Sequence, residues 1–305
     1  RIIEILPIPI ISMLKMNYDL IKLVKKTKIK VIICWRCIHL LPSTIKYINS
    51  LGVITISYNN DDPFNYKIIN NSPWYYFSYW FWYNRSLKYF TINYFYRNIN
   101  VQESKKYGSK NSKILMPYFL PWKDSPQKLT LKEKEKFSCD VVFIGHYEND
   151  GRVLFLRDLV KNDIRVKLFG DGKYWTYGAL GSLYDYFKPI YPVYGTDYAK
   201  ALCGAKICLV FLSKLNRDSY TRRCFEIPAT GSLMLAERTN ELTQFFKEDK
   251  EACFFSTKEE LLTKVRWLLG NPRIIKNISK AGLQKVWSGK HDVYSRSAEF
   301  VNQIK

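Results

Sequence analysis

Short runs of β-branched and other apolar residues alternate with segments of helical spacing along most of this chain. Residues 30–36 and 53–58 are such runs, and each follows a segment in which apolar residues recur at helical intervals. Continuous apolar runs of this length are typical of strands that are buried on both faces of a parallel sheet, with helices as the connections. The pattern predicts an α/β fold built from βαβ units.

The alternation begins again after a polar segment, 125–136, which opens with Ser125-Pro126 and carries four lysines, as linkers do. Beyond it we predict strands at 140–145, 165–170, 207–212 and 232–236, and helices at 152–161, 197–204, 222–230, 258–269, 272–287 and 292–304. The chain of 305 residues is therefore expected to form an N-terminal domain, 1–128, and a C-terminal domain, 129–305, as two doubly wound sheets facing across a cleft.

The charge of the chain favours an anionic partner. Lysine and arginine number 48 against 27 aspartate and glutamate residues, which gives a formal net charge of +21. This charge suits a nucleic acid, a phosphorylated small molecule or an acidic membrane surface. A composition rich in Lys, Ile, Asn, Tyr and Phe also arises from AT-rich codons, so the charge alone does not choose a partner.

The seven cysteines indicate an intracellular protein without a disulfide framework, because their number is odd and most lie inside apolar runs. Cys34 and Cys37 have the spacing of redox and metal sites. A tetrahedral zinc site needs two further ligands, and neither a second pair nor a His cluster accompanies them. We interpret the pair as a buried strand end, with redox or zinc chemistry as the alternative.

No apolar stretch approaches the roughly 20 residues that cross a bilayer, and residues 1–4 lack the layout of a signal peptide, so we expect a cytoplasmic location. The sequence does not begin with methionine, which suggests that it starts inside a longer protein. The aromatic run 73–83 is interpreted as a buried helix. Contact with a membrane interface, where a lipid-linked acceptor would lie, is the first alternative, and stacking on single-stranded nucleic acid is the second.

Two loops at predicted strand ends carry the candidate site residues. In the first, Gly145 and His146 open a turn that leads into a helix beginning at Arg152. A helix N-terminus stabilises an anion such as a diphosphate, and Arg152 would add a bidentate contact. Turns of this kind occur in every α/β domain, so a purely structural role is the alternative.

The second loop carries two carboxylates, Asp218 and Glu226, eight positions apart. Carboxylates accept hydrogen bonds from vicinal hydroxyls, so an acidic pair at strand ends suits a sugar or a ribose. The alternative is that Asp218 caps the helix and Glu226 pairs with Arg222 one turn away. The spacing alone does not decide between these two interpretations.

Residues 221–239, which begin Thr-Arg-Arg-Cys-Phe-Glu-Ile-Pro-Ala-Thr-Gly, resemble the signature of the CgeB-like glycosyltransferases, relatives of the glycosyltransferase group 1 proteins of GT-B fold. Further blocks match in order at 140–150, 198–202, 216–218, 250–252 and 259–261. The resemblance covers the C-terminal domain and is thinner before residue 130. It implies a GT-B-like fold of two Rossmann-like domains, of which the N-terminal, acceptor-side domain is incomplete, because related chains carry a further N-terminal strand and glycine-rich turn.

The resemblance also implies transfer of a sugar from a nucleotide-sugar donor to a glycan, lipid-linked or protein acceptor, without a metal ion or other cofactor. Glu226 matches a glutamate that contacts the donor ribose in related enzymes, and Asp218 replaces a glutamate that contacts the sugar. The family's diphosphate contacts map roughly onto His146 and Arg152. The expected nucleotide-binding set is Gly145, His146, Arg152, Arg217, Arg222 and Gly231.

A base that activates the acceptor would come from the N-terminal domain, where His39, Asp61 and Asp62 follow predicted strands. An isolated histidine near a strand end is usually structural, and His291, in the helical tail, is a weaker candidate. Two other functions stay open. One is a GT-B relative that binds nucleotides without turnover, and the other, less favoured, is a nucleic-acid-binding protein.

Overall fold

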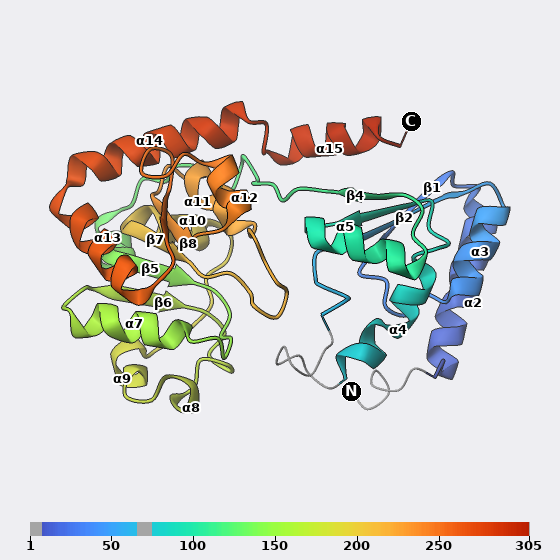
Figure 1. Ribbon diagram of the computed structural model, residues 1–305, viewed down its shortest axis with the longest axis horizontal. Coiled ribbons are helices and arrows are strands. Elements are labelled where there is room, and N and C mark those ends of the chain that lie inside the picture. The colour runs from blue at the N-terminus through green and yellow to red at the C-terminus, as the bar shows by residue number, and fades with distance from the viewer. Residues whose placement is uncertain (1–7, 66–74, 305) are drawn as a thin grey trace. The chain divides into compact units, whose positions relative to one another are not determined.

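The computed structural model describes residues 8–65 and 75–304, in which strands and helices alternate along the chain (Figure 1). The chain forms two compact units. Unit 1 is made from residues within 1–116 and 214–218, and unit 2 from residues within 117–213 and 219–305. Each unit is built on a parallel sheet, which confirms the α/β fold class.

Unit 1 has a four-stranded sheet in the order β1-β2-β3-β4, with all neighbours parallel. Its strands are Val31–Trp35 (β1), Ile54–Asn59 (β2), Ile92–Phe95 (β3) and Ser112–Ile114 (β4). Its helices are Ile11–Thr27 (α2), Pro42–Ser50 (α3), Tyr76–Ser86 (α4) and Asn98–Ser104 (α5), and the 3₁₀ helix Lys105–Tyr107 (η2) follows α5. β1 and β2 confirm the two strands that the apolar runs predicted.

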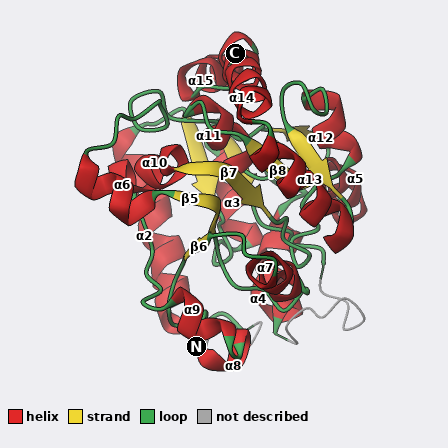
Figure 2. Cartoon of the chain, turned by 90° about the vertical axis from the view of Figure 1, so that its left-hand side faces the viewer, coloured by secondary structure: helices red, strands yellow, loops and turns green. Residues whose placement is uncertain are grey.

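Unit 2 has a five-stranded parallel sheet in the order β6-β5-β7-β8-β9. Its strands are Cys139–Ile144 (β5), Val166–Phe169 (β6), Ala205–Val210 (β7), Met234–Glu237 (β8) and Cys253–Phe255 (β9). Its helices are Leu131–Phe137 (α6), Arg152–Lys161 (α7), Tyr177–Leu180 (α8), Leu183–Phe187 (α9), Gly195–Gly204 (α10), Arg223–Ala229 (α11), Asn240–Phe245 (α12), Lys258–Gly270 (α13), Pro272–Ser288 (α14) and Val293–Asn302 (α15). Helices lie on both sides of this sheet (Figure 2).

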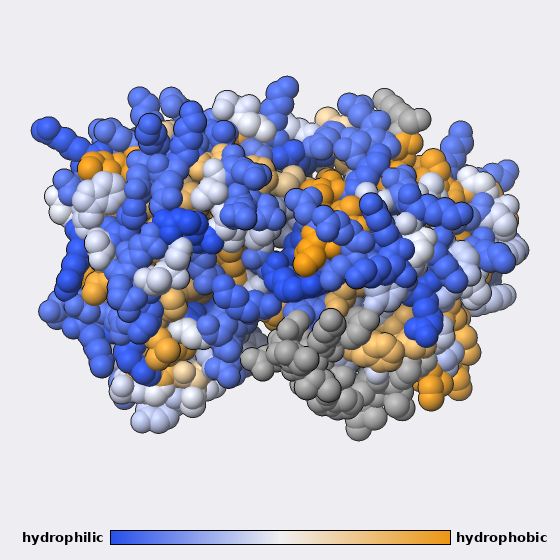
Figure 3. Space-filling model, viewed as in Figure 1, coloured by the Kyte–Doolittle hydropathy of each residue, from blue (hydrophilic) through white to orange (hydrophobic). Residues whose placement is uncertain are grey.

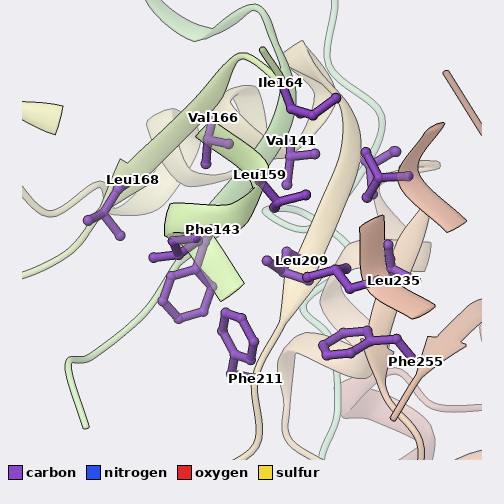
Figure 4. Close-up of a cluster of buried hydrophobic side chains, with 14 of the residues drawn as sticks. Val141, Phe143, Leu159, Ile164, Val166, Leu168, Leu209, Phe211, Leu235 and Phe255 are labelled. Atoms are coloured by element: carbon purple, nitrogen blue, oxygen red, sulfur yellow. The ribbon is translucent and has the colours of Figure 1, made fainter. Parts of the chain in front are cut away.

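The core of unit 2 lies between its sheet and the helices that cover it. Val141, Phe143, Leu209, Leu235 and Phe255 come from four different strands and meet in one cluster of buried side chains (Figure 4). All six residues of β5 are buried. Burial on both faces explains the continuous apolar run at 141–144 within this strand.

Local sequence sets the ends of several helices. Pro42 occupies the first turn of α3, where its missing N–H has no intrahelical partner to lose. Thr130 begins α6 with a capping box, in which its hydroxyl accepts from the Glu133 backbone N–H and the Glu133 carboxylate accepts from the Thr130 N–H. Asp292 caps α15 by accepting from the backbone N–H groups of Tyr294 and Ser295.

The division into units differs from the predicted boundary after residue 128. Phe119, ahead of the polar segment, is fully buried in unit 2, with its ring 4.9 Å from that of Trp287. Its N–H donates to the carbonyl of His291, and its own carbonyl accepts from the N–H of Val293. These contacts hold the chain from Pro117 onward in unit 2. Unit 2 therefore begins before the polar segment 125–136.

The aromatic run forms α4, as predicted for a helix, although its first two residues, Pro73 and Trp74, lie outside the described residues. Trp80 and Tyr83 are buried, with 1% and 0% of their surface exposed, and pack with Phe64 and Phe95. Phe77 is half exposed. The interpretation of core packing is therefore confirmed for Trp80 and Tyr83.

Hydrophilic side chains cover most of the face shown in Figure 3, with hydrophobic residues scattered among them. In residues 8–65 and 75–304 none of the helices combines the length and the apolar character that crossing a bilayer requires.

Candidate functional site

The carboxyl edge of the unit 2 sheet brings the turn after β5 beside the start of α11. The chain leaves β5 through Gly145 and leaves β7 toward α11. A Cβ placed on Gly145 would lie 3.6 Å from Cζ of Arg223, the first residue of α11. The turn after β5 and the first turn of α11 are therefore direct neighbours, at the edge where doubly wound sheets bind ligands.

Glu226 lies in the first turn of α11 with only 7% of its surface exposed. Its Oε1 is 2.7 Å from Nε of Arg222, and its Oε2 accepts a hydrogen bond of 2.8 Å from the hydroxyl of Tyr198 on α10. The predicted pairing of Glu226 with Arg222 is thus present. Because each carboxylate oxygen can accept a second hydrogen bond, this arrangement orients Glu226 and leaves it able to accept from a ligand hydroxyl.

A second buried carboxylate, Asp124, lies beside this pair. It is fully buried, accepts from the backbone N–H of Leu120, and has Oδ2 3.8 Å from Nη2 of Arg222. Lys123 lies 5.1 Å from the centre of the Tyr198 ring. Burial raises the pKa of Glu226, while the positive charge of Arg222 opposes that shift. The positive charges of Arg222 and Lys123 therefore compensate the negative charges of Glu226 and Asp124, in surroundings that largely exclude water.

Arg222 and Arg223 stand at the start of α11, where Arg223 lies beside the turn after β5. Arg222 keeps about a third of its side chain exposed and lies 4.8 Å from the centre of the Tyr118 ring. Within the described part of the chain, no group accepts a hydrogen bond from the buried Nε of Arg223. The sequence analysis missed Arg223, Tyr198 and Asp124, although Arg223 stands in the signature and Tyr198 in a matching block.

Arg152 was expected to clamp a diphosphate, and the structure instead uses it to brace its own loop. Its Nε and Nη2 donate to the two carboxylate oxygens of Asp150, at 2.8 and 2.6 Å, and its Nη1 donates to the carbonyl of His146 at 2.6 Å. Asp150 also accepts from the first N–H of α7. A carboxylate therefore already occupies this helix N-terminus, which weakens the expectation for Arg152. The side chain of His146 in the same turn is exposed.

Gly231 lies at the opposite edge of the sheet from the other candidates. It follows the end of α11 and precedes β8, so it is at the amino edge. Its φ of +74° suits glycine, and a Cβ there would lie 3.7 Å from Pro126 and 3.9 Å from Leu283. The geometry gives Gly231 a role in ending the helix, and the expected nucleotide contact is not supported.

Arg217, which was expected beside the nucleotide, and Asp218, which was expected beside the donor sugar, belong to unit 1. Arg217 donates through Nε and Nη2 to the fully buried Asp62, at 2.5 and 3.0 Å, and to Glu103 at 2.6 Å. The Asp218 carboxylate accepts from Nε of Arg97 at 2.7 Å, and both side chains are at least nine-tenths buried. Asp218 does not cap α11, whose N-cap is Arg222.

The candidate bases of unit 1 have different surroundings. Asp62 is held by Arg217, by the Asn100 side chain and by a backbone N–H, so its carboxylate is fully committed. Asp61 lies 2.9 Å from Nε of Arg36. His39 is half buried in the turn after β1, where its carbonyl accepts from the side chain of Asn17.

His291 was the weakest candidate base, and it lies inside unit 2. Its ring centre is 4.7 Å from that of Phe225, and its Nδ1 is 2.6 Å from a guanidinium nitrogen of Arg296. Burial and the charges of Arg296 and Lys285 lower the pKa of His291 to about 4. These contacts give it a structural role.

Comparison with known proteins identifies the kind of fold that carries this site. Residues 152–302 match the model of a family described as glycosyl transferase-like. No curated protein matches the chain.

Three solved structures are similar to the chain across nearly its whole length. Sucrose-phosphate synthase from Thermosynechococcus elongatus aligns with a TM-score of 0.70 at 9% identity, over 96% of this chain and 77% of that one. A glycosyltransferase from Rickettsia africae gives 0.67 at 12% identity, over 95% and 80%. HepE from Anabaena, in complex with UDP-glucose, gives 0.68 at 8% identity, over 94% and 81%.

These similarities show the fold of the GT-B glycosyltransferases, which confirms the predicted fold class. The match to the glycosyl transferase-like family, at residues 152–302, includes Glu226, Arg222 and Tyr198.

Proposed function

We propose that this protein transfers a sugar from a nucleotide-sugar donor to a glycan, lipid-linked or protein acceptor. The observation that carries the proposal is the buried Glu226, oriented by Arg222 and Tyr198 at the carboxyl edge of the unit 2 sheet. A carboxylate fixed in this way accepts hydrogen bonds from the two hydroxyls of a ribose. HepE, which has a similar fold, was solved with UDP-glucose, which supports a nucleotide-sugar as the donor class.

The arginines beside Glu226 suit the charge that develops in such a transfer. When the bond between sugar and diphosphate breaks, negative charge accumulates on the leaving diphosphate. In this proposal Arg222 and Arg223 stabilise that charge, because preorganised cations at the leaving group lower the barrier without reorganising. Two arginines supply the positive charge that a divalent metal supplies in other transferases, so we propose a metal-independent reaction.

Four finer assignments belong to the proposal. They are membership of the CgeB-like subfamily, a cytoplasmic location with peripheral contact to a membrane that holds a lipid-linked acceptor, activation of the acceptor by His39, and contact of Asp218 with the donor sugar. For Asp218, a sugar would have to compete with the ion pair to Arg97 that the structure shows. Among the candidate bases of unit 1, we favour His39 over Asp62, because the carboxylate of Asp62 is already paired with Arg217.

The donor site is tested by Glu226→Gln, which removes the charge and keeps the shape. We expect UDP or GDP binding, measured by calorimetry, to weaken by about 1.5–3 kcal/mol, the range for hydrogen bonds to charged groups. The matched control is Glu133→Gln, because Glu133 also forms a 2.6 Å ion pair, with Lys200, but lies at the start of α6. Equal nucleotide affinity of the folded Glu226→Gln variant and the parent would remove Glu226 from the site.

Turnover separates an enzyme from a binding protein of the same fold. Incubation with a panel of nucleotide-sugars should release free nucleotide, detected by chromatography, through transfer or slow hydrolysis. A protein that binds UDP or GDP and turns over none of the panel would be the inactive relative. The basic composition also allows nucleic-acid binding, which would show as retention on DNA or RNA that falls steeply with salt.

A further inference from the structure

A pocket of about 390 Å³ lies on unit 2, between α13 and the segment that joins α12 to β9. Its lining residues are Asp249 from that segment and, from α13, Glu259, Glu260, Thr263, Lys264 and Trp267. None of them is a residue of the candidate donor site. Small-molecule sites have volumes of roughly 300–1,000 Å³, so this pocket is large enough for a small organic ligand.

The packing of α13 fixes one wall of the pocket. Glu259, Thr263 and Trp267 follow one another at intervals of one helical turn, so they lie along one side of the helix. The other side carries Leu261 and Val265, which are buried in the core of unit 2. The pocket is therefore built on an element whose position the core determines, which favours a defined ligand geometry.

Ion pairs hold two of the three carboxylates that line the pocket. Nζ of Lys264 lies 2.9 and 2.7 Å from the two carboxylate oxygens of Asp249. Arg238 donates to the two carboxylate oxygens of Glu260, at 3.0 and 2.6 Å. The third carboxylate, that of Glu259, is exposed and can accept hydrogen bonds from a ligand. This set of acceptors suits a ligand with several hydroxyl groups and disfavours an anion.

Trp267 adds an aromatic face to these acceptors. It is 36% exposed, and Nζ of Lys264 lies 5.3 Å from the centre of its ring. The ammonium of Lys264 thus occupies a place that a cationic ligand would take above the ring, and it repels a second cation. A pyranose ring is neutral, and its C–H groups pack against the electron-rich face of an indole while its hydroxyls reach neighbouring acceptors. The combination therefore favours a sugar over a cation.

We propose that this pocket is a binding site for a neutral saccharide. One pyranose ring packs on the exposed part of Trp267, its hydroxyls donate to the carboxylates of Glu259 and Asp249, and the ammonium of Lys264 donates to a sugar oxygen. The pocket shares no residue with the donor site, so it holds a glycan through a ring that is not being transferred. Binding of this kind does not require transferase activity.

The test labels the full chain with 5-fluorotryptophan and follows its tryptophan signals by ¹⁹F nuclear magnetic resonance. Trp267→Leu identifies the Trp267 signal by its loss. Cellotetraose, maltotetraose and chitotetraose are the probes, because they are neutral and differ in linkage and substituents. We expect at least one of them to shift the Trp267 signal to a plateau at millimolar concentration. Glu259→Gln should weaken this binding by about threefold or more, through loss of a hydrogen bond to a charged group.

Trp287→Leu is the matched control, because Trp287 is 43% exposed but lies on α14 with its ring beside that of Phe119. Saturation-transfer signals of the sugar measure its affinity for each variant. Binding should be lost in Trp267→Leu and unchanged in Trp287→Leu. It should also be unchanged in Glu226→Gln, which alters only the donor site.

The absence of a shift of the Trp267 signal with all three tetrasaccharides would overturn the proposal. Equal saccharide affinity of the parent and of a folded Trp267→Leu variant would do the same. A shift caused by tetralysine, with none from the sugars, would identify the pocket as a cation site instead. These results are read from sugar binding alone, so failure of this site and failure of the donor site are distinguishable.

Discussion

The buried ion pair between Arg97 and Asp218 gives the sharpest test of what Asp218 does. Arg97 is 3% and Asp218 10% exposed at the side chain, and Arg97 also donates to the carbonyl of Asn60 at 2.9 Å. Removing one member leaves the other as an uncompensated charge away from water. The expected cost of Arg97→Met or Asp218→Asn alone is therefore about 3–5 kcal/mol of unfolding free energy.

A double-mutant cycle measures the pair itself. Arg97→Met with Asp218→Asn removes both charges, so the double variant should lose several kcal/mol less than the sum of the two single losses. Urea unfolding followed by circular dichroism gives these values, and hydrogen exchange in β3 assigns the change to unit 1. The exposed pair Lys136–Asp197 serves as the control and should show almost no coupling.

The same variants distinguish two roles of Asp218, an anchor of residues 214–218 and a contact to the donor sugar. If Asp218 only anchors residues 214–218 to unit 1, Arg97→Met and Asp218→Asn should change ligand binding alike. If Asp218 contacts the donor sugar, only Asp218→Asn should lower affinity for the intact nucleotide-sugar, by about tenfold or 1.4 kcal/mol, with UDP or GDP affinity unchanged. Single losses below about 1 kcal/mol, or strictly additive losses, would refute the buried ion pair.

Two further predictions concern unit 2. His291 titrates near pH 4 in the folded protein and near 6.5 when unfolded, so stability is complete above pH 6.5 and falls as the pH drops toward 4. With allowance for the partial exposure of the ring, the loss should be about 1–2 kcal/mol, measured by urea unfolding at several pH values, and His291→Gln should remove this part of the slope. Gly231→Ala should cost about 1–2 kcal/mol, because alanine is strained at a φ of +74°, while a thermal-shift titration shows unchanged nucleotide affinity. A weaker nucleotide affinity of Gly231→Ala would show that Gly231 contributes to the nucleotide site.

Several features of the fold could be predicted from the sequence because they depend on local patterns. The apolar runs around β1, β2, β5 and β7 each mark a strand. All residues of β5 are buried, as such a run predicts, whereas Val31, Ile33 and Trp35 of β1 are exposed, which the run did not predict. β9 was not predicted because three residues carry too little periodicity. The pairing of Glu226 with Arg222 was anticipated, since neighbours one helical turn apart meet whenever the helix forms.

The partners of charged residues could not be predicted in the same way. Arg152 is adjacent in sequence to a turn suited to a diphosphate, yet it braces that turn through Asp150, because a carboxylate two residues away was available. Tyr198 and Asp124 reach the site from α10 and from the segment before α6, and the spacing of neither residue in the sequence shows that it lies beside Glu226 or Arg222. An ion pair forms only between side chains that the fold brings within a few ångströms of each other. The spacing of two residues along the sequence does not give that distance.

The sequence by itself determined that this chain forms two parallel α/β sheets and that a carboxylate lies in the first turn of a helix at a strand end. It also determined that two cysteines stand three residues apart. Only the tertiary structure decided that Asp218 and Arg217 join unit 1 and that Tyr198 orients Glu226. The physical reason is that apolar periodicity is read within one element, whereas buried polar groups take whichever partner the packing of distant elements supplies.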